Sequence, residues 1–280
     1  MKKFTILFLA ICLAGGTVMA QDGLGLYAGA DFTIFDFEDA GDNMFIRPYV
    51  GIDKALGALD VYAEAGFDIP LSDGPGMGLD VNAGVNYNLA FGGSSKLTVG
   101  GGLWILFPFD ENKPAIVNSP FGIYITSNLS LSLELAAKFT QTMGFGDLYF
   151  ELQVPFLLVE KNYDPFDLAE LNLTAGVDTT MGLGAGLTLH TWIGSKDFNP
   201  DFLQGFDIFA NYTTGPIFAG VTVGVPLVED GIKRSGISIT PEVEYSLDFG
   251  LSVSAALYID GIASDGDTSI GLTIGAKYKF

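Results

Sequence analysis

Apolar and polar residues alternate along most of this chain, in segments of about ten residues. In the clearest segment the odd positions from Leu59 to Ile69 are apolar, whereas the even positions from Asp60 to Asp68 carry Asp, Tyr, Glu and Gly. Side chains on a β-strand point alternately to opposite faces of the sheet. The pattern therefore predicts an all-β protein whose strands have one apolar and one polar face.

Fourteen alternating segments are expected to be strands. Most are about ten residues long, which is the length that a tilted strand needs to cross a bilayer and longer than the roughly five or six residues usual in soluble proteins. The predicted strands are 24–37, 44–53, 59–69, 79–89, 96–107, 121–126, 129–140, 171–178, 183–193, 206–213, 217–227, 236–247, 251–260 and 269–280.

A further alternating segment, Leu148 to Phe156, leaves the strand count open. Counting it gives an odd total, whereas single-chain bacterial barrels have even numbers of strands. We therefore interpret 141–170 as one long outside loop with a short strand of its own. Between the segments that begin at Phe121 and Leu129 we place a hairpin with a three-residue turn, Thr126 to Asn128, which keeps their apolar residues on one face. About 14 strands are expected, and 16 with one unrecognised strand is the alternative.

Short and long connections alternate between the predicted strands. Short turns are expected near Leu56, Gly92, Ser127, Thr180, Gly215 and Phe249, and longer polar connections at 38–43, 70–77, 108–120, 194–205, 228–235 and 261–268. Barrels of the bacterial outer membrane combine short periplasmic turns with longer extracellular loops. The layout therefore favours a membrane barrel with extracellular loops.

The last predicted strand, Ser269 to Phe280, alternates throughout and ends on an aromatic residue. Its even positions are apolar from Ile270 to Phe280, and its odd positions carry Ser, Gly, Thr and Lys. This strand resembles the closing strand of Gram-negative outer-membrane β-barrels of the porin-like class. The resemblance, which is to a class of proteins, implies contact with outer-membrane lipid and recognition of the strand that ends at Phe280 by the barrel-assembly machinery.

The composition supports a barrel in a membrane. Charged residues make up only 16% of the chain, against roughly 25% in soluble domains. The polar faces carry mostly Gly, Ser, Thr, Asn and isolated acids, whereas the outside of a soluble barrel needs many Lys and Glu residues. Closure also pairs every backbone group, as lipid requires. We expect a transmembrane antiparallel up-and-down β-barrel, and a soluble secreted β-protein is the alternative.

Residues 1–20 have the organisation of a cleaved secretory signal peptide. Two lysines precede an apolar core from Phe4 to Leu13, which is too short for the about 20 residues of a spanning helix. Cleavage after Ala20 would leave 21–280 as the barrel domain and would remove Cys12, the single cysteine. We therefore expect an exported protein without disulfides in the outer membrane of a Gram-negative-type bacterium.

The polar faces of the predicted strands would enclose the lumen, and most of their charged residues are acidic. The expected pore-lining residues are Asp31, Arg47, Asp60, Glu64, Asp68, Asp80, Trp104, Glu134, Lys138, His190, Trp192, Glu242 and Glu244. Excess carboxylates in a pore favour cations. Inward aromatic residues such as Tyr62 could either fill a narrow lumen or form a path for sugars or apolar solutes.

One basic residue of this set is expected to form a structural ion pair. A turn near Leu56 would place Arg47 diagonal to Glu64 and Asp68 on the polar face. Oppositely charged residues at such neighbouring positions of a sheet attract each other. The register therefore predicts an ion pair on the inner wall.

Aromatic residues on the apolar face fall at both ends of the strands. Tyr87, Tyr212, Tyr245, Tyr278 and Phe280 lie at the short-turn ends, and Phe67, Phe107, Phe139 and Phe206 at the other ends. Transmembrane barrels carry such aromatic bands at the two membrane interfaces. We expect the first group to mark one interface.

Few residues have the chemistry of an enzyme or of a metal site. His190 is the only histidine, and no serine constellation can be recognised around it in the sequence. One histidine without a mature cysteine is a weak metal signal, and a net charge of −20 argues against nucleic acid. We expect no enzymatic activity, no cofactor, no metal and no nucleic-acid partner.

These features lead to two functional hypotheses. The first is a porin-like passive channel for small hydrophilic solutes, with an acidic and mildly cation-preferring lumen. The second is a non-conducting surface or structural protein of the outer membrane whose loops bind partners. The solute and the oligomeric state are not predicted by the sequence.

Overall fold

The computed structural model describes residues 24–35, 44–71, 76–109, 115–119, 122–126, 128–160, 165, 167–195, 202–228, 236–262 and 268–280. The predicted signal peptide lies outside these residues. Within them, no helix has the length and apolar character needed to span a membrane.

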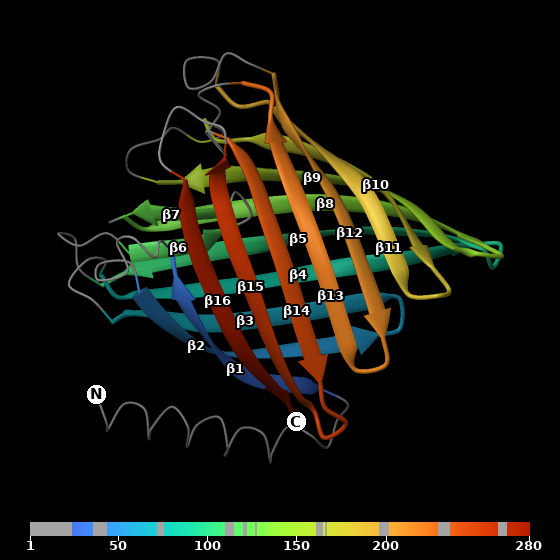
Figure 1. Cartoon of the computed structure of the whole chain (residues 1–280), viewed down its shortest axis with the longest axis horizontal. Helices are drawn as coiled ribbons and strands as arrows, with labels where there is room; N and C mark the ends of the chain where they lie inside the picture. The colour runs from blue at the N-terminus through green and yellow to red at the C-terminus, as the bar shows by residue number, and fades with distance from the viewer. Residues whose placement is uncertain are drawn as a thin grey trace.

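The described chain is built from β-strands that wrap into a barrel (Figure 1). The strands are β1 (Gly25–Ile34), β2 (Met44–Leu56), β3 (Leu59–Pro70), β4 (Gly78–Phe91), β5 (Ser95–Pro108), β6 (Ala115–Ser119), β7 (Gly122–Thr126), β8 (Ser130–Met143), β9 (Gly146–Val159), β10 (Glu170–Thr179), β11 (Leu183–Trp192), β12 (Leu203–Thr214), β13 (Ile217–Pro226), β14 (Ile237–Ser246), β15 (Leu251–Ile262) and β16 (Ser269–Lys279).

Fourteen of these strands form one closed antiparallel barrel. Strands that follow each other in the chain are paired, with the exception that β5 pairs with β8 across the β6–β7 hairpin. The barrel closes between β1 and β16, where Tyr27 faces Lys279 and Ile34 faces Leu272. Figure 1 shows the strands of the front wall crossing those of the rear wall, as tilted strands of a closed sheet do. The predicted up-and-down barrel of 14 strands is confirmed.

Two segments exchange the roles predicted for them. The stretch 141–170 is not a long loop, because it contains β9, a full barrel strand between β8 and β10. Conversely, β7 pairs only with β6 outside the barrel wall, and the short turn predicted at Thr126 to Asn128 lies instead at Gly144–Phe145. Length explains the exchange: β8 and β9 have 14 residues each and pair along their whole length, whereas β7 has five.

The connections differ between the two ends of the barrel. Short turns at 57–58, 92–94, 144–145, 180–182, 215–216 and 247–250 share one end with Phe280, and longer segments join the strands at the other end. Gly57 and Gly215 take φ angles of 68° and 54° in two-residue turns, a conformation that glycine adopts with little strain. We call these ends the short-turn end and the long-connection end.

The register keeps the predicted faces aligned around the whole barrel. Directly opposite residues share a face, and Asp31 lies opposite Arg47 while Gly66 lies opposite Asp80. On the other face, apolar residues are exposed, including Ile208 at 52%. Side chains converge inside a closed wall and diverge outside it, so the buried charged face is the inner face and the exposed apolar face is the outer one.

Two prolines on the outer face interrupt the ladders. Pro48 pairs with Ala30 of β1, but the β2–β3 ladder skips from Ile46 to Tyr49. Pro241 pairs with Val221, and the β14–β15 ladder skips its position as well. A proline lacks the N–H that a ladder needs, so each one is paired with a neighbouring strand on one side only. The register is the same before and after each skipped position, and the β14–β15 irregularity lies at 237–239.

Candidate functional site

The inner face of the barrel gathers most of the charged strand residues. Every residue predicted to line a pore shares the face of Arg47: Asp31, Asp60, Glu64, Asp68, Asp80, Trp104, Glu134, Lys138, His190, Trp192, Glu242 and Glu244. Asp147 and Glu170 join them through β9 and β10, in the segment that sequence reasoning assigned to a loop. The alternation from Leu148 to Phe156 was the signal that could have placed them.

Arg47 is the centre of an ion-pair network across four neighbouring strands. Its Nε donates to Asp80 Oδ1 at 3.0 Å and its Nη2 donates to Glu64 Oε1 at 2.8 Å and to Asp80 Oδ2, while Asp31 lies 3.9 Å from Nη1. The guanidinium reaches Asp80, two strands away, by passing over Gly66, where a Cβ would overlap Nε. The predicted pair with Glu64 is confirmed. Asp80 was predicted to line the pore, but its pairing with Arg47 was not predicted.

Asp68 lies in the same cluster but is paired differently from the prediction. The register of β2 and β3 sets it across from Arg47, on the same inner wall. Asp68 is only 4% exposed, and its Oδ2 has no hydrogen-bond partner in the described part of the chain. The guanidinium is therefore shared by other carboxylates, and Asp68 remains a buried acidic side chain with an unsatisfied oxygen.

A second polar network joins β10, β11 and β12. Nδ1 of His190 lies 2.8 Å from Oδ1 of Asn172, whose Nδ2 is 3.5 Å from Glu170. Nε2 of His190 lies 3.0 Å from Oδ2 of Asp207, as a close polar contact and not as a well-aligned hydrogen bond. Both ring nitrogens thus face oxygen atoms of an amide and a carboxylate. Neither group is a nucleophile of the serine-hydrolase type.

Three lysines of the inner face contact acids or rings. Lys138 lies 3.7 Å from Glu151 and 4.0 Å from the centre of the Tyr149 ring. Across the closing seam, Lys279 binds Asp53 at 3.0 Å. Nearby, Nζ of Lys277 lies 3.8 Å from the centre of the Tyr27 ring. Cation–π contacts and ion pairs of this kind hold the cationic ends against the wall.

Inward aromatic rings lie against the barrel wall. A Cβ at Gly84 would overlap the ring of Tyr62, and one at Gly176 would overlap the ring of Tyr149 on the neighbouring strand. Each ring therefore covers a glycine of the strand beside it, which compensates for the missing side chain. The sequence suggested that these aromatic residues either fill a narrow lumen or form a path for solutes. Their direct contacts are with the glycines of the wall.

The inner face is covered at one end and accessible at the other. At the long-connection end, Leu106, Ser132 and Leu157 are no more than 2% exposed, although they point inward. At the short-turn end, the side chains of Asp53 and Lys279 are 46% and 56% exposed. The β6–β7 hairpin leaves β5 at the covered end and lies against β4 and β5. The interior therefore narrows toward the long connections.

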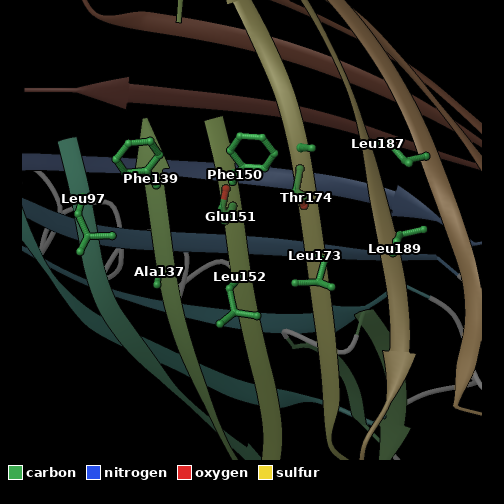
Figure 2. Close-up of a pocket in the computed structure, with 11 residues that line it drawn as sticks. Leu97, Ala137, Phe139, Phe150, Glu151, Leu152, Leu173, Thr174, Leu187 and Leu189 are labelled. Atoms are coloured by element: carbon green, nitrogen blue, oxygen red, sulfur yellow. The ribbon is translucent and has the colours of Figure 1, made fainter. Parts of the chain in front are cut away.

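The outer face is apolar and carries one shallow groove. The groove has a volume of about 440 Å³ and crosses β5, β8, β9, β10 and β11. Figure 2 shows Leu97, Phe139, Phe150, Leu152 and Leu173 along it on neighbouring strands. Such an apolar surface across adjacent strands suits the hydrocarbon of a bilayer.

The predicted aromatic bands agree with the outer face except at one residue. The residues predicted for the short-turn interface are all exposed, at 39–45%: Tyr87, Tyr212, Tyr245, Tyr278 and Phe280. Phe139 was expected at the opposite end, but it pairs with Leu97 near the short turns. The hairpin predicted around Thr126 to Asn128 was wrong, and it reversed the predicted direction of the strand that contains Phe139.

Comparisons with known proteins add a structural likeness. No protein-family profile matches the chain, and no curated protein sequence matches it. Two variants of the porin of Rhodopseudomonas blastica, a triple mutant among them, are 10% and 11% identical in sequence, and each alignment covers 92% of this chain and 99% of the other, with a TM-score of 0.46. Strand pairing and the character of the two faces show that the described chain is a closed antiparallel β-barrel of 14 strands, with an apolar outer face as a transmembrane barrel needs.

Proposed function

We propose that the protein is a passive channel of the outer membrane that admits small hydrophilic solutes and prefers cations. The observation that carries this proposal is the excess of carboxylates on the inner face of a closed barrel. Acids on that face are Asp31, Asp53, Asp60, Glu64, Asp68, Asp80, Glu134, Asp147, Glu151, Glu170, Asp178, Asp207, Glu242, Glu244 and Asp260, against the bases Arg47, Lys96, Lys138, Lys277 and Lys279.

This charge distribution would act on solutes throughout the lumen. Charges of one sign inside a low-dielectric wall focus the field and raise the local concentration of counter-ions. Rings of acidic side chains select cations in known channels. The wall of β13 to β15 offers accessible acids for this, because Glu242 is exposed and Glu244 is half-buried, with a hydrogen bond that it accepts from Ser246.

The same structure supports an orientation in the membrane. Short turns of outer-membrane barrels face the periplasm and long loops face outward, so the narrow end of this barrel would face outward. The last strand closes the barrel beside β1, and the backbone N–H of Phe280 donates to Leu26 at 2.9 Å. A terminal strand in this position is suited to recognition by the assembly machinery before closure.

The covered long-connection end favours a second candidate function. Leu106 and Leu157 are almost fully buried on the inner face, so a barrel closed at this end would not conduct. Such a barrel would serve as a surface or structural protein whose loops bind partners. Conductance across a planar bilayer separates the two functions: discrete open channels favour the first, and electrical silence of correctly folded protein favours the second.

Ion selectivity tests the proposed channel more specifically. In a KCl gradient, the reversal potential of the wild-type channel is expected to report preference for K⁺. Replacing Glu242 and Glu244 together by glutamine should move it toward the value of a non-selective pore, because two inner carboxylates are removed. Asp248→Asn, in an exposed short turn, is the control and should change the potential less. Anion preference of the wild type would contradict the proposal.

A further inference from the structure

The cluster around Arg47 contains a buried carboxylate that receives too few partners. Asp68 is 4% exposed, and its Oδ2 makes no hydrogen bond within the described residues. The register sets Asp68 across from Arg47 and diagonal to Asp80 on the same face. Asp80, Arg47 and Asp31 are close enough to act on it electrostatically, so the carboxylate lies within the cluster.

The one guanidinium of the cluster is already engaged elsewhere. Nε and Nη2 of Arg47 donate to Asp80 and Glu64, and Nη1 is nearest to Asp31. Nε and Nη2 therefore bind two carboxylates, Nη1 lies 3.9 Å from a third, and within the described residues Arg47 donates no hydrogen bond to Asp68. A buried carboxylate without a compensating charge or hydrogen bond is strongly unfavourable. A cation beside Asp68 would neutralise this carboxylate.

We propose that Asp68, together with Asp80, binds one alkali-metal cation, K⁺ or Na⁺, on the inner wall of β3 and β4. The site deepens the proposed cation preference, and it rests on that function for the route by which the ion enters. Asp68 supplies the unsatisfied Oδ2, and Asp80, whose two oxygens also accept hydrogen bonds from Arg47, lies diagonal to it on the next strand. Water and backbone oxygens complete the coordination of a weakly held monovalent ion.

Other cations fit this position less well. Ca²⁺ takes six to eight oxygen ligands and Mg²⁺ requires an octahedral set, whereas no group of three or more acidic, histidine or cysteine side chains in the described chain is placed to hold a metal ion. A bulky organic ammonium group cannot reach a side chain that is 4% exposed. A monovalent ion can keep most of its water ligands, and it is smaller than an organic ammonium group.

Stability in different salts tests the site without any transport measurement. The mature protein is refolded in detergent, and its urea unfolding is followed at neutral pH in KCl, NaCl or choline chloride of equal ionic strength. A ligand that binds only the folded state stabilises it in proportion to the logarithm of its concentration above saturation. The urea midpoint of the wild type should therefore rise with K⁺ or Na⁺ at constant total salt. Equal midpoints in KCl and choline chloride would overturn the site and leave a proton as the neutralising charge.

A neutral variant assigns the effect to Asp68. Asp68→Asn removes the unpaired charge without changing the shape of the side chain, so it should unfold at the same urea concentration in KCl and in choline chloride. In choline chloride, the urea midpoint of Asp68→Asn should be higher than that of the wild type. The matched control is Asp60→Asn, on the same strand and face, where Asn88 already donates to Oδ2 at 2.6 Å. This control should keep the salt dependence of the wild type. Full salt dependence in Asp68→Asn would also overturn the site.

Conductance separates this inference from the proposed channel. If the protein conducts, its K⁺ conductance should saturate at lower K⁺ activity in the wild type than in Asp68→Asn, because a binding site fills. If the urea midpoint rises with K⁺ or Na⁺ but the folded protein never conducts, the cation site is supported and the channel function is wrong.

Discussion

Replacing Arg47 by methionine is expected to lower the free energy of unfolding by about 3–5 kcal/mol, the usual cost of removing one partner of a buried ion pair. The side chain of Arg47 is only 10% exposed. The change leaves Glu64 and Asp80 buried without the guanidinium that they share. Methionine keeps the length and the apolar stem of the side chain. Urea unfolding of the refolded barrel, followed by tryptophan fluorescence, measures the difference.

An exposed ion pair provides the comparison for this experiment. The side chain of Lys138 is 40% exposed, and its Nζ lies 3.7 Å from Glu151. Ion pairs of this kind contribute about 0–1 kcal/mol, so Lys138→Met should unfold within about 1 kcal/mol of the wild type. Similar losses for both variants would show that the Arg47 network does not hold β1 to β4 together.

Removing the β6–β7 hairpin is expected to increase single-channel conductance severalfold. Residues 112–127 would be replaced by a short Gly-Ser linker, which leaves β5 and β8 paired along the barrel wall. Strand β6 of the hairpin lies against β4 and β5, and inward side chains at this end of the wall, such as Leu106 on β5, are almost fully buried. We expect removal of the hairpin to widen the narrow end. Conductance in a planar bilayer measures the change.

The matched control for this deletion is a substitution inside the hairpin that keeps its length. Replacing Asn118 by serine, in the middle of β6, should leave conductance close to that of the wild type. Heat-modifiable mobility on a gel confirms that both variants form the closed barrel. A correctly folded deletion variant with unchanged conductance would show that the hairpin does not narrow the path.

The alternation of residues was sufficient to predict the barrel wall. All predicted strands except 121–126 correspond to barrel strands. Strands with an apolar outer face and a polar inner face produce a clear alternation of apolar and polar residues in the sequence. The same rule failed between 121 and 170. There, two segments had equal periodicity, and only the length of their ladders distinguishes β9 from β7.

The pairing of inner side chains was less predictable than the wall. Which residues face inward follows from parity alone, and Glu64 was correctly matched with Arg47. The bond from Arg47 to Asp80 spans an intervening strand and depends on Gly66 leaving space, which local sequence does not reveal. The contact between His190 and Asn172 was not predicted, although the two residues lie opposite each other on β10 and β11, which were both predicted as strands.

The central claim is that apolar side chains of this barrel face hydrocarbon and polar ones face a lumen. Spin labels on single cysteines at Val221, Thr222 and Val223 of β13 test it directly, because the predicted mature chain lacks the single cysteine, Cys12. In lipid vesicles, labels at 221 and 223 should be relaxed by oxygen, which partitions into hydrocarbon, and the label at 222 by a water-soluble nickel chelate. Labels at 221 and 223 that are shielded from both, or relaxed by the chelate, would contradict the claim.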